Sequence, residues 1–390
     1  MGLVNSALSL RALSLLGLLL AGACAERPLS GVLTPVTATA EGTSKVTVLV
    51  ASMRQRSTDA AQMYSGERAD KVSYASVTVS IPPDGARQSG EVQWPKSLPG
   101  DPKRDFVTLS TDYLDKAQFL AAIDAAAKRT KYNKVVVFVH GFNNRFDDAV
   151  YRLAQIAHDA QAPAIPVLFT WPSRASAALR AYTYDKESAT YSRDAFDDLL
   201  DDLNRNRNLA ETNVLAHSMG NWIVLETLRV RSMRPKAKND KVKSVMLVAP
   251  DIDVNVFQAQ LRRMGPAMPQ LSLFVSRDDK ALGLSEYIAG GVPRLGDIDP
   301  EQEPYKSEFE KARIEVYDLT SIKSGHAHSK AFEQVGTVAG MIRARLAAGQ
   351  KMGDREGSGT SEGLSGVVDA GMNMMRVPRQ GATPAVDRSQ

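Results

Sequence analysis

The sequence contains a single cysteine, Cys24, among its 390 residues. Without a second thiol the chain cannot form an internal disulfide, and an oxidising compartment would leave its covalent structure unchanged. The sequence also lacks a cluster of residues at metal-ligand spacing, and no motif in it calls for a cofactor. We therefore expect neither a metal ion nor a cofactor in the function of this protein.

The sequence lacks a strong excess of either charge. Its 48 Lys and Arg residues nearly balance its 44 Asp and Glu residues, which leaves a net charge of +4. No basic run alternates with aromatic residues, so nucleic acid is not an expected partner. Hydrophobic residues make up 43% of the chain and charged residues 24%, which is the composition of an ordinary globular protein with a sizeable core.

The first 23 residues have the pattern of a secretory signal peptide. Arg11 is followed by an apolar core of roughly nine residues, too short to span a bilayer as a mature helix. The segment LLAGAC resembles a bacterial lipoprotein processing site, which would make Cys24 the lipidated first residue of the mature protein. It departs from that pattern at Ala21, where leucine is usual. The alternative is a cut near Ala23 or Ala25, with the cysteine incidental.

With either cut we expect the chain to be exported. A lipid on Cys24 would anchor it at the periplasmic face of a bacterial membrane. The residue after the cysteine is Ala25 rather than aspartate. By resemblance to lipoproteins in general, this favours the outer membrane of a Gram-negative cell.

The rest of the chain divides into three predicted parts. Residues 24–44 are rich in Thr, Ala, Pro and Gly, and we expect an anchor and flexible tether there. Residues 348–390 are rich in Gly, Ser and Met without a sustained period, and we expect a disordered tail. Residues 45–347 show one continuous pattern and no repeat, which predicts a single α/β domain.

Strands that are apolar throughout alternate with helices across most of this domain. Three early segments, VTVLVAS, VSYASVTVSIP and FVTLS, predict antiparallel strands at the start of the sheet. The alternation that follows predicts a mostly parallel central sheet with helices on both faces. The later predicted strands are 134–139, 165–169, 212–216, 243–248, 271–275 and 313–319, and the predicted helices are 145–160, 176–206, 219–230, 254–264, 281–289 and 329–347.

The segment AHSMG places Ser218 between a short apolar strand and a helix whose apolar residues, from Trp222 to Leu228, have helical spacing. A nucleophile elbow needs this order, because its serine sits on a strained turn and small flanking residues let strand and helix approach closely. A plain helix N-cap is the alternative role for Ser218. The segment GTSEG matches G-x-S-x-G more strictly, but Ser361 has no apolar period around it and is interpreted as linker.

Catalytic groups of such a sheet collect in the loops at the carboxyl ends of its strands. Acyl transfer by a serine needs an imidazole base, a carboxylate that orients the imidazole, and amides for the developing oxyanion. In α/β-hydrolases the chain order is serine, acid, histidine. Ser218, Asp279 and a histidine of the segment 326–328 supply this order. The backbone amides of Met219 and Phe142 are the candidates for the oxyanion hole.

The residues alone leave two of these assignments open. Asp279 is the first choice for the acid, but Asp278 is its neighbour. Asp251 and Asp253 follow the preceding strand, where some hydrolases keep the acid. The base is either His326 or His328, because a loop this short could bring either one to the serine.

Two other histidines of these loops are expected to be structural. His140, in VHGF, is predicted to brace the oxyanion loop by hydrogen bonding rather than to carry protons. His217 would point away from Ser218 at a tight turn.

The chain resembles the bacterial α/β-hydrolase family of unknown function described as esterase/lipase superfamily enzymes. The resemblance covers residues 45–345 and is carried by VFVHGFNN, FTWPS, VLAHSMGN, LVAPDID, SRDDKALGLS and HSKAF, with VLVASMRQR, SGERA and VSIPP upstream. It implies an α/β-hydrolase fold and a serine hydrolase site, with the nucleophile at Ser218, the acid at Asp279 and the base at the second histidine, His328. The chain departs from the family at Ala216, where glycine is usual.

These features predict a serine hydrolase that cleaves an ester or related acyl bond through an acyl-enzyme on Ser218. We expect a small or short-chain acyl substrate, because the one candidate for a lipase lid, residues 173–191, is not very apolar. Amide and thioester substrates stay open. The alternative is a hydrolase-fold envelope lipoprotein with a weak or idle site and a binding or scaffolding role, against which the full Ser, Asp and His set argues.

Overall fold

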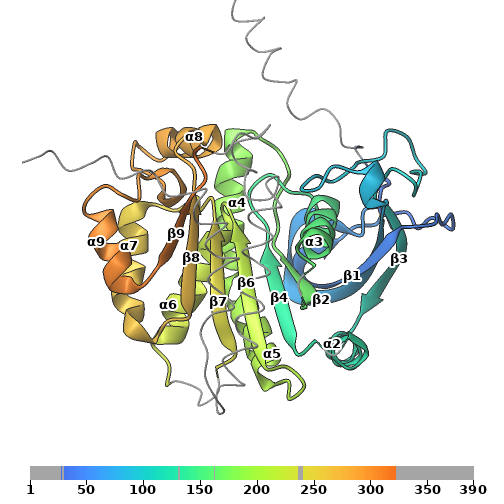
Figure 1. Cartoon of the computed structure of the whole chain (residues 1–390), viewed down its shortest axis with the longest axis horizontal. Coiled ribbons are helices and arrows are strands. Elements are labelled where there is room, and N and C mark those ends of the chain that lie inside the picture. Colours follow the sequence, from blue (N-terminus) through green and yellow to red (C-terminus); the bar gives the residue numbers. More distant parts are fainter. Residues whose placement is uncertain (1–27, 29, 131, 162, 236–239, 322–390) are drawn as a thin grey trace, which may run out of the picture.

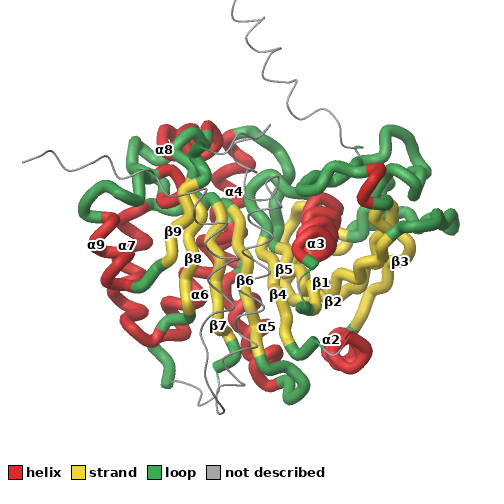
Figure 2. Tube along the Cα trace, viewed as in Figure 1, coloured by secondary structure: helices red, strands yellow, loops and turns green. Residues whose placement is uncertain are grey.

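The structure, a computed structural model, describes residues 28, 30–130, 132–161, 163–235 and 240–321. The described chain is built around one nine-stranded sheet (Figures 1 and 2). Its strands are β1 (Ser44–Arg56), β2 (Tyr64–Ile81), β3 (Val107–Leu114), β4 (Lys134–Val139), β5 (Ile165–Thr170), β6 (Glu211–His217), β7 (Val242–Val248), β8 (Gln270–Val275) and β9 (Glu315–Asp318).

The strand order is β3-β2-β1-β5-β4-β6-β7-β8-β9. The first two strand pairs, β1 with β2 and β2 with β3, are antiparallel, and every other pair is parallel. This confirms both the antiparallel start and the mostly parallel sheet that the sequence predicts. Because β4 to β9 run in the same direction, the loops that follow these strands gather at one edge.

Helices cover both faces of the sheet (Figure 1). Side chains of α3 pack on one face, and side chains of α2, α5, α6, α7 and α9 pack on the other. None of the described helices is long and apolar enough to cross a membrane. The α-helices are α2 (Lys116–Thr130), α3 (Phe146–Ala160), α4 (Leu179–Tyr191), α5 (Arg193–Arg205), α6 (Gly220–Ser232), α7 (Val254–Met264), α8 (Lys280–Ile288) and α9 (Tyr305–Ala312).

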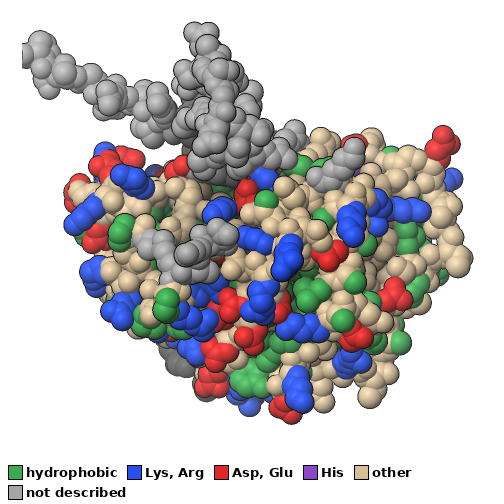
Figure 3. All heavy atoms as spheres, turned by 90° about the horizontal axis from the view of Figure 1, so that it is seen from below, with side chains coloured by type: hydrophobic (Ala, Val, Ile, Leu, Met, Phe, Trp, Pro, Cys, Tyr) green, Lys and Arg blue, Asp and Glu red, His purple; other side chains and the backbone are tan. Residues whose placement is uncertain are grey.

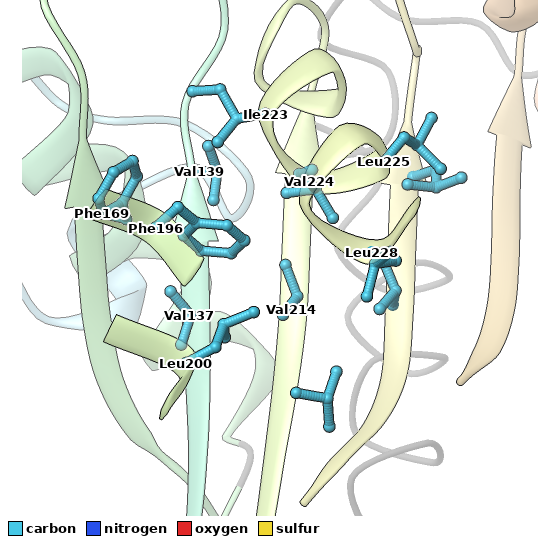
Figure 4. Close-up of a cluster of buried hydrophobic side chains, with 14 of the residues drawn as sticks. Val137, Val139, Phe169, Phe196, Leu200, Val214, Ile223, Val224, Leu225 and Leu228 are labelled. Carbon is cyan, nitrogen blue, oxygen red and sulfur yellow. The ribbon is translucent and has the colours of Figure 1, made fainter. Parts of the chain in front are cut away.

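The centre of the core lies between the middle strands and the helices α5 and α6. Val137 of β4 and Val214 of β6 face Phe196 of α5 and Ile223 and Leu228 of α6 (Figure 4). All six residues of β4 are buried, because helices cover both of its faces, and this explains why the strand is continuously apolar after Lys134 rather than alternating. Burying each such side chain contributes about 1.5–3 kcal/mol.

The structure corrects the predicted helices at three places. The single helix predicted over 176–206 is two helices, α4 and α5, which meet at Ser192. Two further helices, α2 and α9, were not predicted at all. The predicted helix over 329–347 and the predicted tail over 348–390 lie outside the described residues.

Two residues of the segment that is expected to be a flexible tether, Val32 and Leu33, pack on the fold. Val32 and Leu33 are buried in the same core as α3. The carbonyl oxygen of Val32 accepts hydrogen bonds from Tyr151 Oη at 2.9 Å and Thr108 Oγ1 at 3.0 Å. The folded unit therefore begins before residue 45, the predicted boundary.

Candidate functional site

Ser218 occupies a strained turn between β6 and α6. Its φ is +51°, in the left-handed region that residues with a side chain rarely adopt, and it is only 3% exposed. The turn is held in place from two sides. The amide of Ser218 donates to the carbonyl oxygen of Val248 at 2.9 Å, and its carbonyl oxygen accepts from Asn221 Nδ2 at 2.8 Å. The strand, strained turn and helix that the sequence predicts around this serine are all present.

Two glycines allow the loop after β4 to lie directly against this turn. A Cβ on Gly220 would lie 2.5 Å from the carbonyl oxygen of His140, and a Cβ on Gly141 would lie 2.7 Å from the Cβ of Ser218. Only glycine permits such close approach of two backbones. The structure thereby brings Phe142, next to Gly141, and Met219 to the neighbourhood of Ser218.

Asp279 lies at the end of β8 and caps α8. It is 2% exposed, and its Oδ1 accepts from the amides of Ala281 at 3.0 Å and Leu282 at 3.2 Å. Its neighbour Asp278 is exposed and accepts from Ser276 Oγ at 2.6 Å. Of the two adjacent aspartates, the structure therefore turns Asp279 inward and Asp278 toward solvent.

Asp251, after β7, is also buried, and its carboxylate is held by three side chains. It accepts hydrogen bonds from Ser285 Oγ at 2.5 Å and from Tyr182 Oη at 3.2 Å, and it forms an ion pair with Arg294 Nε at 3.4 Å. Burial, followed by the nearby Asp251 carboxylate, raises the pKa of Tyr182 to about 12, so the phenol stays protonated and can donate. The amide of Asp251 donates to the carbonyl oxygen of Ser218 at 3.3 Å.

This Asp251 network joins α4 and α8 beside the nucleophile, at the same edge of the sheet (Figure 2). Tyr182 of α4 also contacts the ring of Phe142, edge to face, with centroids 5.4 Å apart. Sequence reasoning missed Tyr182, Ser285 and Arg294, because none of them stands in a recognisable motif and the fold brings them together from separate elements.

His140 is completely buried and braces the loop after β4, as the sequence predicts. Its ring stacks on Trp171 with centroids 4.9 Å apart, its Nδ1 lies 2.9 Å from the carbonyl oxygen of Gly141, and its Nε2 accepts from the Trp171 amide at 3.2 Å. Burial, followed by the charge of Arg54, lowers the pKa of His140 well below its usual value. The imidazole is therefore neutral at physiological pH and makes structural hydrogen bonds.

Asp297 contributes a further carboxyl group near the end of β8. Burial raises its pKa to about 7, and the negative charges of Asp279, Glu286 and Asp278 add to the effect in that order. The group therefore titrates near neutral pH, next to the candidate acid Asp279.

Several predicted site residues lie outside the described part of the chain. These are both candidate bases, His326 and His328, the candidate lipidation site Cys24, and Ser361. His217 is described and half-buried, with its Nδ1 beside Gly141. Within the described ranges, no group of three or more His, Cys, Asp or Glu residues could hold a metal ion.

Comparison with known proteins gives one family and several distant structures. The model of the family described as "Alpha/beta hydrolase of unknown function (DUF900)" matches residues 115–345. No curated protein matches the chain.

Three solved structures with low similarity are hydrolases or related proteins. The siderophore hydrolase EstA from Aspergillus nidulans is 13% identical with a TM-score of 0.36, and the match covers 81% of this chain and 98% of that one. The esterase Pf2001 from Pyrococcus furiosus is 12% identical with a TM-score of 0.30, covering 57% and 84%. A lipase-esterase related protein from Clostridium acetobutylicum is 12% identical with a TM-score of 0.29, covering 55% and 95%. TM-scores below 0.5 say nothing about activity or substrate.

Proposed function

This chain belongs to the family of alpha/beta hydrolases of unknown function and has the alpha/beta-hydrolase fold, and we propose that it is a serine hydrolase that cleaves an ester or related acyl bond. Ser218 carries the proposal. A serine held at a φ of +51° costs of order 1–3 kcal/mol, and such strain clusters at functional sites. A plain helix N-cap would not need that conformation, because N-caps adopt extended backbone angles.

In the proposed reaction, Ser218 Oγ attacks the carbonyl carbon of the substrate while the imidazole of His328 takes its proton. The carbonyl π bond opens to an oxyanion, which the amides of Met219 and Phe142 would stabilise. The intermediate collapses to an acyl-enzyme as His328 returns the proton to the leaving group. A water molecule then attacks the carbonyl carbon of the acyl-enzyme while His328 takes its proton. His328 returns this proton to Ser218 Oγ as the carboxylic acid leaves. Asp279 would orient the imidazole and stabilise its charged form.

Asp279 is a better candidate for this role than Asp251. Both carboxylates are buried, but Asp251 is already held by Ser285, Tyr182 and Arg294. The Asp251 carboxylate would have to give up one of these contacts to orient an imidazole. The resemblance to the family also puts the acid at Asp279, and the amides of Ala281 and Leu282, which donate to its Oδ1, fix the direction of its carboxylate.

The properties of residues 173–191, the segment that would be the lid in a lipase, support a small or short-chain acyl substrate. Within 173–191, the exposed large hydrophobic side chains are Leu179 and Tyr191. Tyr182, in the middle of this segment, is tied to Asp251 and Ser285. A segment with so little apolar surface, fastened at its centre, is unlike an apolar lid that opens to admit a long chain.

Labelling with a fluorophosphonate probe tests the proposal, since only an activated serine reacts readily with it. We expect the mature protein to be labelled, Ser218→Ala to lose the label, and the matched control Ser361→Ala to keep it. Absence of labelling in the folded wild-type protein would contradict the proposal. That result would favour a lipoprotein whose site is idle and whose role is to bind an envelope partner.

We further propose that residues 1–23 direct export and that a lipid on Cys24 anchors the protein at the periplasmic face of the outer membrane. The LLAGAC segment supports this. In a Gram-negative host, wild-type protein should sediment with the outer membrane, whereas Cys24→Ser should appear in the soluble periplasmic fraction. Equal partitioning of the two proteins would show that the cysteine is incidental.

A further inference from the structure

Arg54, near the end of β1, is a charged residue in the interior of the protein. It is 1% exposed, although arginine is almost never fully buried without a paired charge. Among the described residues, no carboxylate lies within ion-pair distance of it; Asp185, Asp148 and Asp147 act on its charge from further away. Burial lowers the pKa of Arg54 to about 10, so the guanidinium stays charged at neutral pH. Removing a charged group from water is unfavourable, so other interactions of Arg54 must offset this desolvation.

The guanidinium of Arg54 joins the two loops that follow β4 and β5. One terminal nitrogen, Nη2, donates to the carbonyl oxygen of Asn144 at 2.8 Å, in the loop after β4. The other, Nη1, donates to the carbonyl oxygen of Ser173 at 3.0 Å, in the loop after β5, and Nε donates to Thr170 Oγ1 at 2.7 Å. A planar group with five N–H donors can hold both loops at once, which an ammonium group cannot do in the same way.

The same guanidinium adds a donor beside Nε2 of His140. Three donors surround its Nε2: the Trp171 amide at 3.2 Å, the Thr170 hydroxyl at 2.9 Å and Arg54 Nη2 at 3.3 Å. The Thr170 hydroxyl can donate to the ring because its oxygen accepts from Arg54 Nε. With Nε2 acting as acceptor, the proton of the neutral ring lies on Nδ1, which donates to the carbonyl oxygen of Gly141 at 2.9 Å.

That last hydrogen bond sets the direction of the Phe142 amide. The carbonyl of Gly141 and the N–H of Phe142 belong to one planar trans peptide, so they point in opposite directions. Holding the carbonyl toward His140 therefore aims the N–H away from it. Asn144 holds the next peptide, since its Nδ2 donates to the carbonyl oxygen of Phe142 at 2.8 Å.

We propose that Arg54 is a positioning residue for the hydrolase reaction, which holds the His140 ring and the two loops in place and so orients the Phe142 amide toward the oxyanion. Arg54 does not touch the substrate and acts through His140 and the two loops. The inference rests on the proposed function, because it takes the Phe142 amide as an oxyanion donor.

Arg54→Lys is the decisive variant, because lysine keeps the charge but cannot reproduce the fork of donors. We expect kcat on a p-nitrophenyl ester to fall about 10- to 100-fold with KM nearly unchanged, since weakening one oxyanion donor affects the transition state selectively. The rate of fluorophosphonate labelling should fall by a similar factor. Arg56→Lys is the matched control: Arg56 is exposed, lies two residues further along the same strand and stacks on Tyr113.

A spectroscopic measurement separates this inference from the proposed function. In protein labelled with ¹⁵N at histidine, the nitrogen shifts of His140, assigned with His140→Gln, should show a single Nδ1-protonated tautomer. Arg54→Lys should shift the Nε2 resonance, because Nε2 loses the Arg54 donor and the Thr170 hydroxyl loses the Arg54 Nε–H that orients it. If wild-type protein is not labelled by the probe, the proposed function fails, while the His140 shifts still report whether Arg54 positions His140. A folded Arg54→Lys variant with wild-type kcat and an unchanged His140 spectrum would overturn the inference.

Discussion

At the scale of single residues, three of the aspartates after β7 and β8 differ in the contacts that hold their carboxylates. Asp251 is bound by three side chains, Asp278 faces solvent, and Asp279 caps α8 through one oxygen. The same residue type within one edge of the sheet can therefore carry three different roles, which the structure distinguishes by burial and partners rather than by sequence position.

Substitution of each aspartate tests this division. Asp279→Asn should lower kcat by about 10⁴, because an asparagine favours the wrong tautomer of the base while leaving the geometry intact. Asp278→Asn is the adjacent control and should stay close to wild type. Asp251→Asn should mainly lower the free energy of unfolding, and its kcat should fall less than the kcat of Asp279→Asn. Steady-state kinetics and urea unfolding measure these effects in all three variants. A folded Asp251→Asn variant that loses more kcat than Asp279→Asn would assign the acid to Asp251 instead.

Asp297 gives the stability of the protein a distinct pH dependence. Its folded-state pKa of about 7 lies above the ordinary value of 3.8. Between these values the folded protein holds a proton that the unfolded chain lacks, so the free energy of unfolding falls as pH rises through this window. Asp297→Asn removes that fall. The difference in Tm, variant minus wild type, should therefore be larger at about pH 8 than at about pH 5.

The exposed Asp70 of β2 provides the control for this experiment. Asp70→Asn should show a Tm difference that changes little between the two pH values. A Tm difference for Asp297→Asn that shrinks or stays constant as pH rises would contradict the raised pKa.

The sequence predicts some of the site residues well and others not at all. Ser218 and Gly220 are predictable because strand, tight turn and helix leave a local pattern of residue types. Arg54 and Tyr182 are not, because their roles depend on contacts with residues more than 60 positions away. Arginine is usually exposed, so the residue type gives no indication that Arg54 is buried.

At the scale of elements, the segment before β1 contributes two residues, Val32 and Leu33, to the core. We expect Leu33→Ala to lower the free energy of unfolding by about 2–5 kcal/mol, because Leu33 is fully buried. Thr34→Ala, at the exposed neighbouring position, should change it by less than about 0.5 kcal/mol. Urea unfolding of the two variants measures both. Equal, small effects would show that the segment is a tether after all.

The elements that the sequence predicts correctly are those with the strongest period. The predicted strand over 134–139 matches β4 residue for residue, because burial on both faces makes it continuously apolar after Lys134. Helix α2 was missed, although Asp115 and Gln118 exchange capping hydrogen bonds at its start, a signal that the sequence does carry. The boundary between α4 and α5 at Ser192 has no glycine or proline to mark it, so tertiary packing decides it.

At the scale of the whole molecule, a parallel sheet collects the site at one edge. The nucleophile turn, the loop that faces it and both buried aspartates follow strands β6, β4, β7 and β8, whose carboxyl ends lie together. Basic and acidic side chains are interspersed over the face seen in Figure 3, as the nearly balanced composition suggests. The proposed chemistry depends on the local geometry of this one edge of the sheet.

Trapping the acyl-enzyme tests the central claim most directly. The mature protein would be mixed with p-nitrophenyl acetate, quenched in acid and digested, and its peptides analysed by mass spectrometry. We expect one acetyl group on the peptide that contains Ser218, formed together with a burst of p-nitrophenol, and neither in Ser218→Ala. Hydrolysis of the ester without an acetyl group on Ser218, or at an equal rate in Ser218→Ala, would contradict the assignment of this serine as the nucleophile.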